Sequence, residues 1–256
     1  TGRPGSFAAF TAGLNRLLEC GVKVRLKAMA LRSNYREFPL IADFCRARTK
    51  DYFRFDPQLH LRFDRNEERN QMIRAERLTP EEIVALEREN EERFASLRKN
   101  CGILINERVA HEGCDHLFHC GLGAGSFNVG YDGTFRLCSS LWAPETVCDL
   151  RCCTLREAWE QFVPKVRGMR SRRPEYLAMC RSCPIINLCL WCPAHAYLET
   201  GELDGPVANF CQVARARAAA IQGMDRDASH RSIDNAEQKV FPEVPGPVPL
   251  AAKAGN

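Results

Sequence analysis

The sequence CRSCPIINLCLWC, at residues 180–192, places four cysteines at the spacing Cys180-x2-Cys183-x5-Cys189-x2-Cys192. A Cys-x-x-Cys loop is short enough to put two thiolates on one ion or cluster, and thiolates bind soft metals. Four more cysteines outside this stretch extend the pattern, and they are Cys114, Cys120, Cys138 and Cys211. The eight cysteines predict two four-thiolate metal sites, with the rest of the chain as scaffold around them.

The overall composition excludes several classes of protein. The 256 residues are 45% hydrophobic and 27% charged, with a formal net charge of +4. Acidic and basic residues are interspersed, so the basic stripe that nucleic-acid binding requires is missing. No run approaches the roughly 18 apolar residues of a membrane helix, and the opening residues TGRPGS carry no apolar signal core. We therefore expect a cytoplasmic protein without nucleic-acid or membrane partners, whose chain continues upstream of Thr1.

The cysteine content favours metal binding over disulfides. Fourteen cysteines in 256 residues lie below the roughly 8–10% of a disulfide scaffold, and the sequence shows no secretory signal. Zinc is the serious alternative, because paired Cys-x-x-Cys knuckles are its common signature. Zinc ribbons separate the knuckles by about 15–20 residues, whereas only five residues lie between Cys183 and Cys189. The short gap favours a cuboidal iron–sulfur cluster, or a split in which Cys192 serves another site.

The first quarter of the chain predicts alternating helices and strands. Apolar periodicity indicates a helix over residues 5–19 that ends at Gly21, a strand over 22–31, a helix over 35–46 and a strand over 52–63. This order is typical of α/β folds with parallel strands. Two strands cannot bury a parallel sheet by themselves, so we expect the end of a longer barrel, with a small complete α/β subdomain as the alternative.

Local signals predict the elements that follow. Residues 64–77 are charged and predict a loop, and Thr79-Pro80-Glu81-Glu82 is a capping box that opens a helix to about residue 99. Residues 127–138 predict a β-hairpin with a type I′ turn at Asp132-Gly133, which carries Cys138 back toward Cys114 and Cys120.

The last third of the chain is expected to be mainly helical. Thr154 to Glu157 forms a second capping box at the start of a helix. A final helix is predicted over residues 213–222 and is expected to end at Gly223. Residues 225–256 are polar and then rich in Pro, Ala and Gly, which indicates a disordered tail.

Three histidines and six further cysteines are secondary candidates. His111, His116 and His119 could ligate zinc or iron, but eight cysteines already complete two sites, so we favour a solvated polar loop. Structural burial is the default expectation for the remaining cysteines. These are Cys20, Cys45, Cys101, Cys148, Cys152 and Cys153.

The cysteine segment resembles the SPASM domain, the C-terminal auxiliary-cluster domain of radical SAM enzymes. The family pattern contains Gly-x4-Cys, then Cys-x2-Cys-x5-Cys-x3-Cys and a last cysteine. Here Gly133-x4-Cys138 precedes the motif at residues 180–192, and Cys211 follows it. One departure is the x2 spacing between Cys189 and Cys192, where the family has x3, so the local loop differs.

The resemblance implies a ligand set for each of two auxiliary 4Fe–4S clusters. Cys114, Cys120, Cys138 and Cys192 would hold the first cluster. Cys180, Cys183, Cys189 and Cys211 would hold the second cluster. No Cys-x3-Cys-x2-Cys triplet occurs in this sequence. The third 4Fe–4S cluster and S-adenosyl-L-methionine are therefore expected in a longer parent chain.

The same resemblance implies a fold and a domain division. Residues 1–66 would be an α/β remnant of a partial (β/α) barrel, with Asn34 on its S-adenosyl-L-methionine side, and 67–110 a linker with a helix. Residues 111–224 would be a small α+β, cysteine-rich cluster-binding domain with a β-hairpin, followed by the tail at 225–256.

The implied function is radical modification of a peptide or protein substrate, of the maturase type, with an external electron donor such as a flavodoxin or ferredoxin. In the family, hydrogen abstraction by a 5′-deoxyadenosyl radical starts the reaction, while the auxiliary clusters pass electrons or anchor substrate. No local acid–base pair stands out, so no catalytic residue is named. The alternatives are a non-catalytic electron-transfer or peptide-docking iron–sulfur module, and a zinc-binding structural module.

Overall fold

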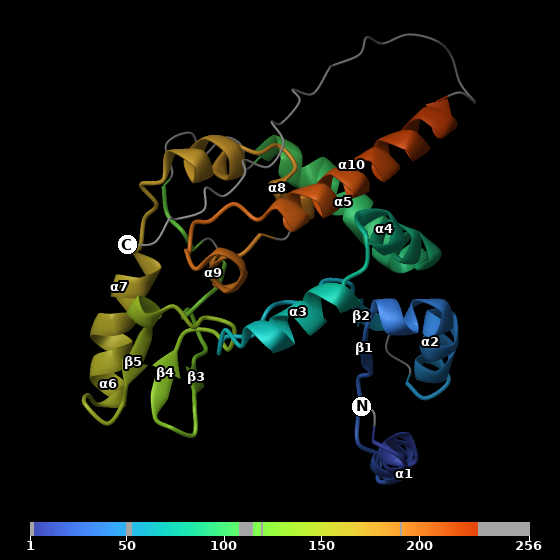
Figure 1. The fold of residues 1–256 in the computed structure, drawn as a ribbon, viewed down its shortest axis with the longest axis horizontal. Coiled ribbons are helices and arrows are strands. Elements are labelled where there is room, and N and C mark those ends of the chain that lie inside the picture. Colours follow the sequence, from blue (N-terminus) through green and yellow to red (C-terminus); the bar gives the residue numbers. More distant parts are fainter. Residues whose placement is uncertain (1–2, 50–52, 108–114, 119, 190, 230–256) are drawn as a thin grey trace, which may run out of the picture.

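The structure is a computed structural model that describes residues 3–49, 53–107, 115–118, 120–189 and 191–229 (Figure 1). It mixes helices with two small sheets. The elements of the first half are α1 (Ser6–Glu19), β1 (Lys27–Met29), the 3-10 helix η1 (Arg32–Glu37), α2 (Phe38–Arg46), β2 (Arg54–Asp56), α3 (Glu67–Glu76), α4 (Pro80–Glu89) and α5 (Glu91–Glu107).

The second half contains the hairpin sheet and the segments that carry most of the cysteines. Its elements are β3 (Asn128–Val129), β4 (Thr134–Arg136), the 3-10 helix η2 (Pro144–Thr146), β5 (Val147–Asp149), α6 (Leu155–Glu157), the π-helix η3 (Ala158–Phe162), α7 (Val163–Arg167), the π-helix η4 (Tyr176–Arg181), α8 (Ile186–Cys189), α9 (Pro193–Thr200) and α10 (Ala208–Ser229). The predicted tail from residue 230 onward lies outside the described residues.

The first sheet consists of β1 and β2, which pair in parallel as the helix–strand alternation predicts. Its strands are only three residues long, much shorter than the predicted ranges. An aromatic cluster packs between this sheet and α2: the Phe38 ring lies 5.2 Å from Phe55 and 5.8 Å from Phe53. Each buried phenylalanine contributes about 1.5–3 kcal/mol by leaving water, so this cluster holds α2 against β2.

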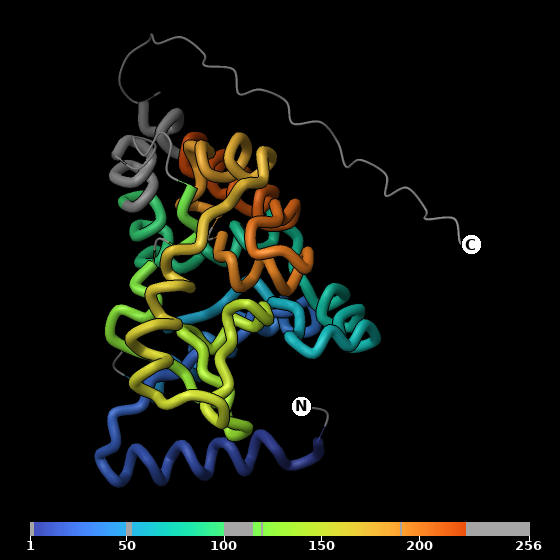
Figure 2. The backbone as a smooth tube through the Cα atoms, turned by 90° about the vertical axis from the view of Figure 1, so that its left-hand side faces the viewer, coloured from blue at the N-terminus to red at the C-terminus, as the bar shows by residue number. Residues whose placement is uncertain are grey.

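Helix α1 stands at the edge of the N-terminal part of the structure, residues 3–63 as far as they are described, which we call the first lobe (Figures 1 and 2). It ends before Gly21, whose φ of 72° is the left-handed conformation expected of a C-terminal stop. Leu14 is buried, whereas Phe7, Phe10 and Leu17 remain exposed. Only part of the apolar face on which the helix prediction depends is therefore buried against the described part of the chain.

Two predictions between residues 64 and 107 are wrong. The expected charged loop forms α3, because the Asn66 Oδ1 accepts the backbone N–H of Arg69 at 3.0 Å and acidic residues occupy the first turn. The single helix expected over 80–99 is two helices. Asn90 leaves the helical conformation and its Oδ1 accepts the backbone N–H of Arg93 at 3.0 Å, which starts α5.

The hairpin is confirmed, but its predicted turn type is wrong. A type I′ turn needs positive φ at both central residues. Gly133 has a φ of 82°, whereas Arg65 is the one non-glycine with positive φ in the described part of the chain. Asn128 pairs with Arg136, so a four-residue loop connects the strands, and β5 adds a third antiparallel strand that the sequence reading missed.

Helix α10 is longer than predicted at both ends. It begins at Ala208, so Cys211 lies inside its first turn, and it continues through Gly223 to Ser229. A glycine weakens a helix interior by only about 1 kcal/mol, which is not enough to end one. Helix α10 packs against α4 and α8, which lie between the first lobe and the cysteine-rich segment (Figure 1).

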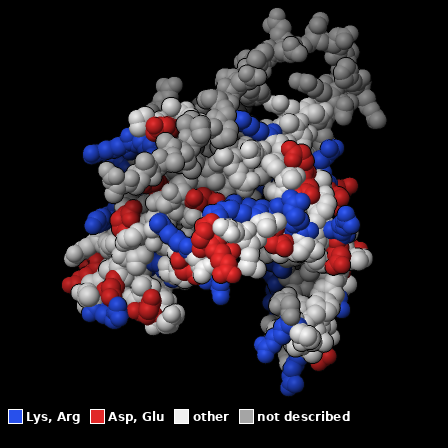
Figure 3. Space-filling view, viewed as in Figure 1, with Lys and Arg blue, Asp and Glu red and all other residues white. Residues whose placement is uncertain are grey.

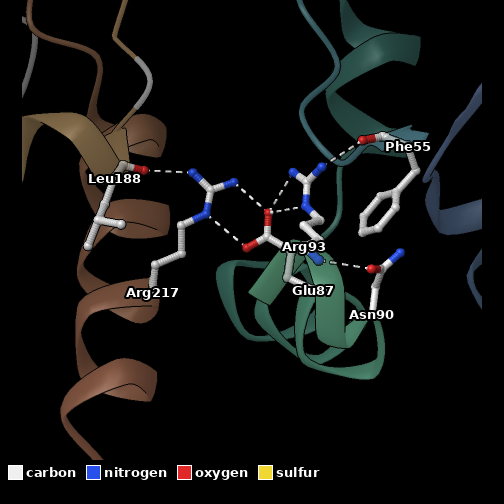
Figure 4. Close-up of polar contacts among 6 residues, drawn as sticks. All are labelled: Phe55, Glu87, Asn90, Arg93, Leu188 and Arg217. Carbon is white, nitrogen blue, oxygen red and sulfur yellow. Dashed lines mark hydrogen bonds and ion pairs between the residues drawn. The ribbon is translucent and has the colours of Figure 1, made fainter. Parts of the chain in front are cut away.

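A buried ion network joins these helices (Figure 4). Glu87 of α4 and Arg217 of α10 are both fully buried, and the Arg217 Nε and Nη2 donate to the two Glu87 carboxylate oxygens at 2.9 and 2.7 Å. The Arg217 Nη1 also donates to the Leu188 carbonyl at 2.6 Å. Arg93 donates to Glu87 at 2.9 Å and to the Phe55 carbonyl at 3.0 Å. The network thus connects β2, α4, α8 and α10.

The surface offers no single-sign charge field on the face shown in Figure 3, where acidic and basic side chains are interspersed. Among the described residues, no helix has the length and apolar character needed to cross a membrane.

The buried network generates a stability prediction. Glu87→Gln keeps the side-chain shape but leaves two arginines facing a neutral amide, so we expect the free energy of unfolding to fall by about 3–5 kcal/mol. Urea denaturation of the variant measures this change. The control is Glu89→Gln on the exposed side of the same helix, which should change stability by less than about 0.5 kcal/mol. Equal effects in the two variants would show that the network contributes nothing special.

Candidate metal-binding thiol sites

The structure brings four cysteines together around the first turn of α10. The Cys189 and Cys211 thiols share a hydrogen bond, and Cys180 and Cys183 both interact electrostatically with Cys211. Cys189 in turn interacts with Cys180 and Cys183. We call these four residues the second thiol set, and they are the four that the family resemblance assigns to the second cluster.

Short local elements position this set. Cys180 lies in η4, Cys183 in the turn that follows, and Cys189 is the last residue of α8. The Cys183 amide donates to the Cys180 carbonyl at 3.2 Å, which closes the Cys-x-x-Cys turn. Arg217 holds the carbonyl just before Cys189, as described above. The same helix, α10, therefore supplies Cys211 and the arginine that positions Cys189.

Two causes set the pKa values of these thiols: burial for Cys180 and Cys183, and the contact between Cys189 and Cys211 for the other two. Burial raises the pKa of Cys180 to about 12 and also raises the pKa of Cys183. Donation from Cys189 lowers the pKa of Cys211, with help from the nearby Arg215 guanidinium, and raises the pKa of Cys189. A bound metal would be needed to deprotonate all four thiols together.

Cys192 does not join this set, although it stands only three residues after Cys189. Its electrostatic partners are Cys120 and Cys138, from the loop before the hairpin and from the residues just after β4. We call Cys120, Cys138 and Cys192 the first thiol set. Cys114, its predicted fourth member, lies outside the described residues. Neighbouring cysteines in the sequence are thus divided between two sets.

Cys192 immediately precedes α9, which begins at Pro193. Burial raises the pKa of the Cys192 thiol, while the backbone amides of His195 and Ala194 at the start of the helix oppose this rise. These amides would stabilise a thiolate ligand at this position, because a helix N-terminus favours negative charge.

Within each set the thiols interact with one another, but their sulfurs do not surround a single point. In the part of the chain that the structure describes, no group of three or more Cys, His, Asp or Glu side chains is arranged to hold one metal ion. A tetrahedral zinc site with Zn–S bonds of about 2.3 Å would need such a tight group. A cuboidal cluster presents several separate irons to its ligands, so it does not require four sulfurs around one point.

Comparison with known proteins adds nothing to this geometry. No family model, curated protein or solved structure matches the chain. The resemblance drawn from the cysteine spacing therefore depends on the residues alone.

The other predicted candidates have different positions. Both polar groups of the Asn34 amide are used locally: its Oδ1 accepts the Leu31 N–H at 2.8 Å and its Nδ2 donates to the Met29 carbonyl at 3.0 Å. Asn34 thus shapes the turn after β1. His116 pairs with Arg170 through an isolated antiparallel β-bridge of the backbone. His111 and His119 lie outside the described residues.

Burial of the six remaining cysteines is confirmed only in part. Cys45 is buried, as expected, whereas Cys20 and Cys152 are exposed. Cys148 and Cys153 are half-buried with their sulfurs 3.0 Å apart. The side chain of Cys101 lies outside the described part of the chain.

The surroundings of Arg136, a buried arginine beside the first thiol set, indicate whether an anionic group fits at that set. Arg136 is 5% exposed, and within the described residues its Nε and Nη1 have no hydrogen-bond partner. The Cys138 thiol lies near it, two residues along the chain. Neutral thiols are weak acceptors. An anionic cluster would therefore match the unpaired Arg136 donors better than neutral thiols would.

A pair of histidines docks α9 on the segment after β2. The rings of His60 and His195 stack with their centroids 3.5 Å apart. Next to them, Arg77 forms an ion pair with Glu199 of α9 and donates from Nε to the Leu59 carbonyl at 2.8 Å. No sequence signal connected these residues, because the two partners lie in segments far apart in the chain.

The His60 imidazole is held in its neutral form. Burial, then the neighbouring His195, lowers its pKa to about 4, and its Nδ1 has no hydrogen-bond partner among the described residues. The unfolded chain takes up a proton near the ordinary value of about 6.5. The stabilisation is therefore complete above pH 6.5 and is lost as the pH falls from about 6.5 to about 4.

This pair generates a pH-dependent prediction. We expect the chain to lose roughly 2–3 kcal/mol of unfolding free energy through His60 between pH 7.5 and pH 4.5. His60→Phe keeps a ring against His195 and cannot titrate, so its stability should fall less over this range. Urea denaturation at several pH values measures the two slopes. Identical slopes would contradict the assignment.

Proposed function

We propose that this chain is the C-terminal part of a radical SAM enzyme with a SPASM domain, and that it supports radical modification of a peptide or protein substrate. In this proposal the first thiol set, completed by Cys114, holds one auxiliary 4Fe–4S cluster, and the second thiol set holds another. When bound, such clusters supply one-electron transfer or an anchoring site for substrate.

The observation that carries the proposal is that Cys189 and Cys192 have different thiol neighbours. A zinc knuckle would keep the two ends of a Cys-x-x-Cys loop on one ion. Here Cys189 interacts with Cys211, while Cys192 interacts with Cys120 and Cys138. This division supports the interleaved pattern of two auxiliary clusters, even though the x2 spacing departs from the family pattern.

The chain's own residues would bind and orient these groups rather than perform proton transfer. Arg217 orients the backbone before Cys189, and the start of α9 faces Cys192 with backbone amides. The parallel pair β1 and β2 with Asn34 would be the end of the barrel that binds S-adenosyl-L-methionine. A cytoplasmic location and an electron donor such as a flavodoxin or ferredoxin belong to the same proposal.

The iron content tests the cluster assignment. Two 4Fe–4S clusters predict about eight irons per chain after anaerobic purification, and Cys192→Ala should retain about four. Cys20→Ala, which removes an exposed cysteine outside both thiol sets, is the matched control and should keep the full content. Colorimetric iron analysis with visible absorbance measures all three proteins. Zinc in place of iron, or full iron in Cys192→Ala, would overturn the assignment.

An electron-transfer or peptide-docking module is the second candidate function. The observation that favours it is that the sequence contains no Cys-x3-Cys-x2-Cys triplet. Formation of 5′-deoxyadenosine by the full-length protein, given S-adenosyl-L-methionine and a reductant, separates the two. Product formation supports the enzyme, whereas iron-loaded protein without product supports the module.

A further inference from the structure

Arg136 of β4 has more hydrogen-bonding capacity than its surroundings satisfy. A guanidinium carries five N–H donors and no acceptor. The Arg136 Nη2 donates to the Asn128 Oδ1 across the hairpin at 2.8 Å. Its Nε and Nη1 are inaccessible to solvent and have no acceptor in the described ranges.

Aromatic rings close one side of this guanidinium. Its central carbon lies 3.5 Å from the centroid of the Trp142 ring, which stacks in turn on Phe63 at 3.8 Å with planes 10° apart. Phe63 comes from the segment after β2 and Trp142 from the loop after Cys138. The stack keeps water from the arginine, and it ties the hairpin to the first lobe.

The charge of Arg136 also lacks a dedicated partner. The two acidic groups near it are the Asp132 carboxylate and the Cys138 thiol. Asp132 is engaged with Thr134, accepting from the hydroxyl at 2.7 Å and from the backbone N–H at 3.1 Å. A buried, unpaired cation is costly, and with Asp132 engaged the remaining acidic group beside Arg136 is the Cys138 thiol, two residues along the chain. A neutral thiol there would leave the arginine unmatched.

We propose that Arg136 is the buried counter-charge of the iron–sulfur cluster held by the first thiol set, and that it sets the reduction potential of this cluster. The inference rests on the proposed function. Each reduction adds one electron and therefore one negative charge to a cluster. A nearby fixed cation in a dry environment stabilises the more negative, reduced form. Arg136 thus raises the potential of the first cluster relative to a chain without this charge.

The test compares reduction potentials in three anaerobically prepared full-chain proteins: the unmodified chain, Arg136→Gln and Arg156→Gln. Arg156 is the matched control, because its side chain is 83% exposed on α6. Dithionite titration, followed by visible absorbance and electron paramagnetic resonance, should resolve two one-electron waves. In Arg136→Gln, one wave should move to lower potential by at least a tenfold change in equilibrium constant, about 59 mV. The other wave should not move, and Arg156→Gln should match the unmodified chain.

The outcomes separate this inference from the proposed function. No iron in the unmodified chain overturns both. About eight irons with unmoved waves overturns only the role of Arg136. If Arg136→Gln loses one cluster, Arg136→Lys decides: retained iron with a smaller shift supports the counter-charge, because lysine keeps the charge without the planar fork. Loss of iron in both variants would make Arg136 a structural residue and overturn the inference.

Discussion

The fully buried ion pair between Glu87 and Arg217 is the constraint on which the arrangement of this molecule depends. Both groups have left water completely, and such a pair is tolerated only when each guanidinium nitrogen finds an acceptor. Arg217 meets this condition by using the Leu188 carbonyl as well as the carboxylate. The helices α4, α8 and α10 can therefore pack together in essentially one arrangement, and the position of Cys189 relative to Cys211 follows from it.

A second set of packing contacts, independent of the Glu87–Arg217 ion pair, places Cys192 in a different thiol set from Cys189. Helix α9 is held on the segment after β2 by the stacked pair His60 and His195 and by the ion pair of Arg77 with Glu199. Cys189 belongs to a helix held by α10, whereas Cys192 precedes a helix held by the first lobe. The two thiol sets interleave because successive short helices dock on different partners.

Positive charge accompanies the cysteines, on the buried Arg136 and on the exposed Arg215, even though the visible surface mixes both signs (Figure 3). Arg136 lies beside Cys138, and Arg215 lies near Cys183 and Cys211. Thiols alone need no such neighbours, whereas thiolates around a cluster carry net negative charge. Electrostatic complementarity of this kind links the thiol geometry to the proposed chemistry better than either the composition or the net charge of the chain.

The sequence by itself determined the features that depend on contacts within a few residues. Thr79 and Thr154 open helices through the predicted capping boxes, and the hairpin before Cys138 forms where its alternation indicated. The docking of α9 on the segment after β2 and the packing of α10 against α4 and α8 were decided by tertiary structure. Burying residues such as Val213 and Ile221 of α10 in the core contributes more than a local propensity of about 1 kcal/mol. The partners of Arg136, His60 and Arg217 likewise come from distant segments, and spacing along the chain carries no information about them.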